Sequence, residues 1–138
     1  MNTLQQYFDA ALRSLNRSNF LALSEPERVL ATIWCLEGDV NNGGFDQYYF
    51  NSSGDLAHFA PTALMLIGAS NMADIVHRAN SLLGPDGPSR DRFSRQGQLS
   101  ALTDRFSAFD GLDRAFYAYP DEISTLLSAY LRRNGYDI

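Results

Sequence analysis

The sequence of 138 residues contains no lysine, only one cysteine and only two histidines. One cysteine excludes an internal disulfide. Neither histidine belongs to a His-x-x-x-His or Glu-x-x-His pair, so zinc and di-iron helix sites lack ligands. No apolar run approaches the roughly 18 residues of a membrane span, and the first residues lack the regions of a signal peptide. We therefore expect a soluble cytoplasmic protein with no metal, no cofactor and no membrane contact.

Enzyme motifs are also missing. The sequence has no Cys-x-x-Cys pair and no glycine-rich phosphate loop, because Gly43 and Gly44 form a turn pair rather than a P-loop. Cys35 lies within a helical pattern, which favours a small core residue over a nucleophile. The spacing leaves open only an exposed pair of Asp46 and His58. We expect no catalytic residue and no enzymatic activity.

The charge is net acidic and uneven. Sixteen acidic residues face eleven arginines, giving a formal charge of −5, and such a protein is a poor non-specific binder of nucleic acid. Residues 25–55 hold six carboxylates against Arg28 alone. One interpretation is an ordinary solvated surface, which the arginines of residues 90–95 could also neutralise across the fold. The other is an acidic face that binds a basic protein partner. The candidate partner-binding residues are Glu25, Glu27, Asp39, Asp46 and Asp55.

The hydrophobic periodicity is helical almost throughout. It predicts one all-α domain over residues 1–138, with about seven or eight helices. Capping patterns place helix starts near Ser24, Pro61, Ser70, Asp110 and Pro120. Residues 84–89 form the clearest loop. The 3-4-3 spacing of four apolar residues predicts a continuous helical seam over 99–109.

Residues 37–54 form the densest constellation of polar and aromatic side chains. In one interpretation these side chains join two helices. Gln47 and Asn51 then reach one neighbouring turn, and Glu37 accepts N–H groups at the start of a short helix from Phe45. In the other, the stretch is a ligand- or peptide-binding pocket with aromatic walls at Tyr48 or Tyr49.

This stretch carries a family resemblance. Ten residues match the signature E–NGGF–QYF–N–G of a bacterial domain family of unknown function whose named member is a DNA-mimic protein: Glu37, Asn42, Gly43, Gly44, Phe45, Gln47, Tyr48, Phe50, Asn51 and Gly54. Weaker matches extend the resemblance over about residues 25–133. It implies an all-α monomer or dimer without catalytic activity.

In the DNA-mimic member, function depends on surface carboxylates rather than on the signature. A mimic needs rows of uncompensated carboxylates, because B-DNA carries one charge per about 1.7 Å of axis. The eleven arginines of this sequence depart from that requirement. Two hypotheses follow: an acidic interaction protein that antagonises a basic or DNA-binding partner, and a ligand- or peptide-binding module built on residues 37–54.

Overall fold

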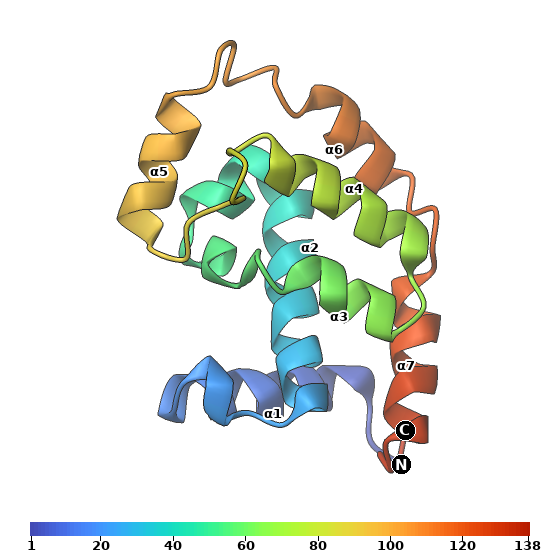
Figure 1. Cartoon of the computed structure of the whole chain (residues 1–138). Coiled ribbons are helices and arrows are strands. Elements are labelled where there is room, and N and C mark those ends of the chain that lie inside the picture. The colour runs from blue at the N-terminus through green and yellow to red at the C-terminus, as the bar shows by residue number, and fades with distance from the viewer.

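The computed structural model describes all residues 1–138 as one all-helical domain without strands (Figure 1). This confirms the predicted fold class. Two short 3₁₀-helices, η1 (Phe20–Ala22) and η2 (Ser52–Leu56), accompany the α-helices. The seven α-helices are α1 (Leu4–Arg17), α2 (Glu25–Phe50), α3 (Ala60–Leu66), α4 (Ser70–Ser81), α5 (Arg92–Ser100), α6 (Asp110–Tyr117) and α7 (Ile123–Arg133).

Helix α2 is the axis around which the other helices pack (Figure 1). It begins with the predicted capping box, in which Ser24 accepts the Glu27 N–H and Glu27 accepts the Ser24 N–H. Its buried residues occur on several sides of the helix, among them Leu30, Ile33 and Leu36. A helix that is apolar on several sides belongs at the centre of a fold.

The remaining helices surround this axis. In Figure 1, α1 crosses the lower end of α2, α3 and α4 lie one above the other, and α5 and α6 flank the upper end. The two ends of the chain meet beside α7, where the Asn2 N–H and the Tyr7 hydroxyl both donate to the Asp137 carbonyl. None of the helices combines the length and the hydropathy that crossing a bilayer requires.

Several local predictions are wrong in detail. The expected seam over 99–109 is interrupted, because α5 ends at Ser100 and Asp104 has a φ of 53°. Phe106 is consequently 86% exposed. Ser70 does not cap α4 with its side chain; instead Asp121, distant in sequence, accepts the Met72 N–H at 2.8 Å. Similarly, Asp110 makes no capping bond to α6, and α7 begins three residues after Pro120.

A fully buried arginine fastens α5 to the end of α2. The Arg95 guanidinium donates to the Asp55 carboxylate at 2.9 Å and to four carbonyls, those of Tyr49 at 2.6 Å, Asn51 at 2.8 Å, Ser89 at 2.9 Å and Arg90 at 3.4 Å. A buried charge is tolerated when it is paired and hydrogen-bonded. The negative end of the α2 dipole adds to this stabilisation, since its last carbonyls face the cation.

Replacing Arg95 with methionine should lower the free energy of unfolding by about 3 kcal/mol, because Asp55 and four carbonyls lose their donor. Arg92→Met is the matched control. Arg92 is exposed and donates to the Phe50 carbonyl alone, so its loss should cost about 1 kcal/mol or less. Urea denaturation followed by circular dichroism measures both. Equal effects of the two substitutions would contradict the central role of Arg95.

Candidate functional site

The signature residues build a kink that divides α2 into two helical halves. Gly43 and Gly44 interrupt the helical backbone, and Gly44 has a φ of 75°. A Cβ on Gly44 would lie 2.6 Å from the Asp113 carboxylate. Glycine is therefore required at Gly44 by both the backbone conformation and the close approach of α6.

The anion at the start of the second half is Asp113 of α6, not Glu37 as predicted. Asp113 accepts the Phe45 N–H at 2.8 Å, which stabilises the positive end of the new helical segment. Burial raises the pKa of this carboxyl, and its hydrogen bond to Phe45 opposes that rise. The sequence pattern missed Asp113 because 68 residues separate it from Phe45.

Glu37 instead accepts a hydrogen bond from the Tyr119 hydroxyl at 2.6 Å. The same hydroxyl accepts from Asn41 at 2.7 Å, so a short polar chain links α2 to the segment after α6. Burial raises the pKa of Glu37, against the effect of the Tyr119 hydrogen bond. Burial and the bond to Glu37 also raise the pKa of Tyr119 to about 12.

The two amides of the signature converge on one carboxylate, as their spacing predicts. Gln47 donates to Asp39 Oδ1 at 2.7 Å, and Asn51 donates to the same oxygen at 3.2 Å. Asn42 in turn donates to Gln47 Oε1 at 3.1 Å. These contacts run from the second half of α2 back to the first, across the kink, and therefore hold its angle.

The aromatic residues of the signature pack inside the protein rather than around a pocket. Phe45, Tyr48 and Tyr49 are fully buried. Phe45 contacts Phe116 with ring centroids 5.8 Å apart. By contrast, Phe50 is 42% exposed and lies against the guanidinium groups of α5 and the following turn.

Gly54, the last residue of the signature, packs directly against the side chain of the buried Arg95. A Cβ at Gly54 would lie 2.6 Å from Arg95 Nε and 2.7 Å from the Tyr48 carbonyl oxygen. This position leaves no room for a side chain. The signature residues thus form intramolecular contacts that shape α2 and its junction with η2 and α5.

The five predicted partner-binding carboxylates fall into two groups along α2 and η2. Glu25 and Glu27 lie at its start, and the other three lie around or beyond the kink. Fourteen residues at 1.5 Å each separate Glu25 from Asp39 by about 21 Å. Asp46 is paired with Arg105 at 2.8 Å and Asp55 with Arg95 at 2.9 Å, whereas Glu25 accepts from the neutral Tyr130 hydroxyl at 2.8 Å.

Comparison with known families identifies the fold built by these contacts. The sequence profile described as DMP19-like protein matches residues 21–134. The chain belongs to this family. No curated protein and no solved structure matches the chain.

Family membership covers more than the signature, since the matched range runs from η1 to the end of α7. Helices α5 and α6, which contact the signature, lie within this range. The two main partners of the signature are Asp113 on α6 and Arg95 on α5. In this DMP19-like chain the signature is therefore one part of a longer packing unit.

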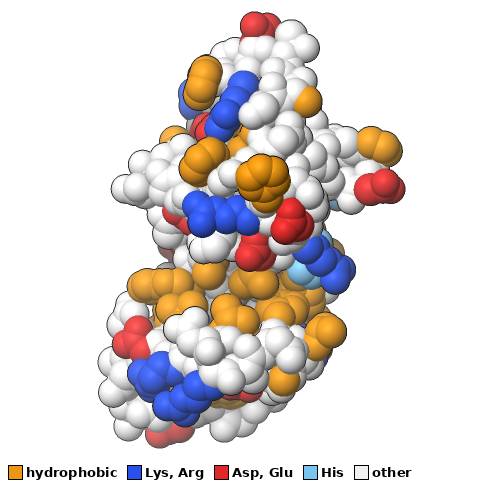
Figure 2. All heavy atoms as spheres, turned by 90° about the vertical axis from the view of Figure 1, so that its left-hand side faces the viewer, with side chains coloured by type: hydrophobic (Ala, Val, Ile, Leu, Met, Phe, Trp, Pro, Cys, Tyr) orange, Lys and Arg blue, Asp and Glu red, His pale blue; other side chains and the backbone are white.

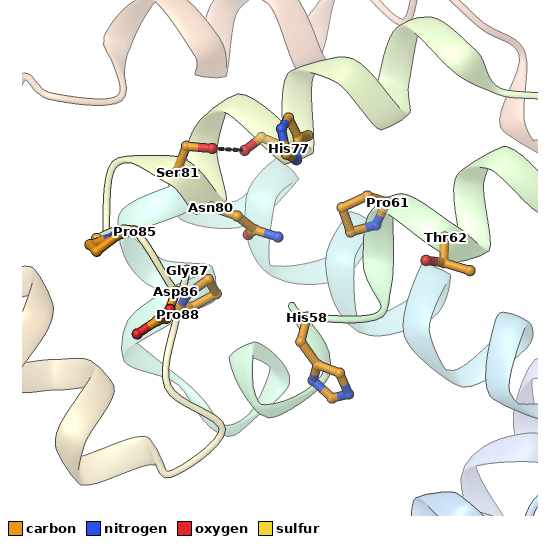
Figure 3. Close-up of a pocket in the computed structure, with 11 residues that line it drawn as sticks. His58, Pro61, Thr62, His77, Asn80, Ser81, Pro85, Asp86, Gly87 and Pro88 are labelled. Atoms are coloured by element: carbon orange, nitrogen blue, oxygen red, sulfur yellow. Dashed lines mark hydrogen bonds between the residues drawn. The ribbon is translucent and has the colours of Figure 1, made fainter.

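The two histidines line a separate polar cavity of about 380 Å³ between α3, α4 and the loop before α5 (Figure 3). Their rings lie at opposite ends of the group of side chains in that view. His58 contacts the Asp55 carbonyl, so the pair of His58 and Asp46 that the sequence left open does not form. No group of three or more metal-ligating residues gathers anywhere in the chain.

Substitution of Gly44 by alanine should destabilise the protein by about 2 kcal/mol, since the residue has a positive φ and the new methyl group displaces Asp113. Gly38 is the matched control, because it lies in the helical part of α2 with no atom near its Cβ position. Gly38→Ala should stabilise by about 0.5–1 kcal/mol. Chemical denaturation tests both signs. Stabilisation by both substitutions would show that the kink is dispensable.

The half-buried carboxyl of Glu37 predicts a pH dependence of stability. Its pKa is higher in the folded than in the unfolded protein, so proton binding favours folding and this contribution grows as pH falls from 7 through the folded pKa. Glu37→Gln keeps an acceptor for Tyr119 and lacks this titration. The variant should melt above the wild type at pH 7, and the difference should shrink toward pH 5. A difference in melting temperature that widens as the pH falls would contradict the raised pKa of Glu37.

Proposed function

We propose that this DMP19-like protein is a non-enzymatic interaction protein whose acidic surface binds a basic protein partner. The partner class that fits best is a DNA-binding protein, which the acidic surface would occupy in place of DNA. Family membership supports the proposal. The main argument for it is the distribution of negative charge among the carboxylates.

The carboxylates greatly outnumber the ion pairs. Four of the sixteen acidic side chains have a cation within 4 Å, namely Asp46, Asp55, Asp74 and Asp137. The other twelve have none, although many accept hydrogen bonds from neutral donors. A hydrogen bond from a neutral group leaves the net charge of a carboxylate in place, so the surface keeps the negative potential that attracts a basic partner.

The distinction between carboxylates with and without a cation partner reduces the set of predicted contact residues from five to three. Asp46 and Asp55 are neutralised by Arg105 and Arg95. Glu25, Glu27 and Asp39 keep their charge. The separation of about 21 Å between the ends of this set corresponds to about six base-pair steps of B-DNA, at 3.4 Å per step. A DNA-binding face is large enough to contact both ends.

The alternative module built on residues 37–54 receives less support. Its proposed anchors, Gln47 and Asn51, already donate to Asp39. Its proposed wall residues, Tyr48 and Tyr49, are fully buried. A ligand at this place would have to displace contacts that hold the kink of α2.

The test is a pull-down from nuclease-treated lysate of the source cell, with the intact protein immobilised. We expect retention of a basic DNA-binding protein that elutes at moderate salt, since exposed charges are screened within about 10 Å at 0.1 M salt. A DNA duplex carrying the site of that protein should displace it. Retention that is insensitive to both salt and duplex would contradict the proposal.

A triple variant locates the surface. Glu25→Gln, Glu27→Gln and Asp39→Asn remove three charges but keep an acceptor at each position, and glutamine preserves the capping box at position 27. We expect at least a tenfold loss of affinity for the retained partner.

A second triple variant controls for net charge. Asp9→Asn, Asp86→Asn and Asp104→Asn also remove three charges, each from an exposed position without an ion pair, and asparagine tolerates the positive φ at 104. This control should bind within about twofold of the wild type. Equal losses in both variants would assign the binding to net charge rather than to this surface.

A further inference from the structure

An apolar groove runs between α1 with η1 and the segment that contains η2. Figure 2 shows it as a hollow where hydrophobic side chains gather, above the part of the molecule that holds α1. Its volume is about 540 Å³, which lies within the range of small-molecule sites. Its apolar lining comes from Leu12, Leu15, Phe20, Leu21 and Leu56.

The lining remains accessible to solvent. Leu21 is 76% exposed, and Leu12, Leu15 and Phe20 are half-buried. Single exposed apolar residues are ordinary, whereas a contiguous hollow of them is typical of a binding surface. The groove shares no residue with the carboxylates of the proposed contact surface.

The charged side chains at the edge of the groove indicate which charge a ligand of the groove should carry. Asp55 lines the groove, but its carboxylate is paired with Arg95. Arg90 also lines it, is exposed and has no carboxylate within 4 Å. Burial and the neighbouring Arg90 lower the pKa of His58, so this ring is neutral at pH 7. Arg90 is therefore the one charged side chain in the lining without a partner of opposite charge.

We propose that the groove binds a small amphipathic anion, with its apolar chain along the leucines and its carboxylate against Arg90. An amphipathic cation would meet the like charge of Arg90, and an uncharged chain would gain nothing from it. This site is independent of the proposed acidic contact surface, so either proposal can fail without the other.

Binding of decanoate, decanol and decyltrimethylammonium to the intact protein tests the head group. We expect decanoate to bind tightest and the cation weakest by isothermal titration calorimetry, below the micelle concentrations of the two ions and the solubility limit of decanol. In a series from hexanoate to decanoate, each added CH₂ should lower Kd about fourfold. Equal affinity for the three head groups, or affinity independent of chain length, would overturn the proposal.

Variants and the single thiol locate the site. Arg90→Gln should weaken decanoate up to about fivefold without changing decanol, and Arg133→Gln, at an exposed position on α7, should change neither. Leu21→Asp should weaken both ligands, whereas Met65→Asp, equally a change at an exposed apolar residue, should not.

Cys35 lines the groove and is the only cysteine. Decanoate should slow its alkylation by iodoacetamide in the wild type, under conditions where circular dichroism shows no unfolding. Alkylation at an unchanged rate in saturating decanoate would place the ligand elsewhere and overturn the assignment.

Discussion

The burial of one positive charge sets the architecture around the end of α2. Arg95 is fully buried, and its guanidinium is satisfied by four carbonyls and one carboxylate. These acceptors belong to α2, to the loop before α5 and to η2, so the cation fixes three segments at once. Its position also explains Gly54, because any side chain there would occupy the space of the guanidinium. A signature glycine thus depends on an arginine that lies outside the signature.

Two helix starts in this fold are capped by acidic residues that lie far away in the sequence. Asp113 receives the N–H of Phe45 at the kink of α2, and Asp121 receives that of Met72 in the first turn of α4. Each bond places an anion at the positive end of a helix, where the dipole favours it. The acidic composition is therefore partly a requirement of the fold. A count of carboxylates alone overstates the number that are free to contact a partner directly, although a neutral donor leaves their charge in place.

The sequence predicted contacts between near neighbours and missed those between distant ones. The capping box of Ser24 and Glu27 and the convergence of Gln47 and Asn51 follow from spacings of three and four residues, which helix geometry fixes. The partners Asp113 and Arg95 could not be predicted, because they depend on how α5 and α6 pack. The expected seam over 99–109 failed for a related reason. Its apolar spacing is helical, but the positive φ at Asp104 ends the regular backbone, and periodicity does not detect a break at a residue that also tolerates helix.

The same hydrogen bonds connect the signature to the proposed surface. Gln47 and Asn51 hold Asp39 with two neutral donors, which fix the orientation of the carboxylate but do not cancel its charge. Arginine partners at Asp46 and Asp55 have the opposite consequence, since they fix the carboxylate and neutralise it. The choice of donor therefore decides whether a carboxylate serves the fold alone or also presents charge to a partner. On this basis an exchange of Arg105, the donor at Asp46, for a neutral donor would add negative surface and leave the kink and the buried arginine unchanged.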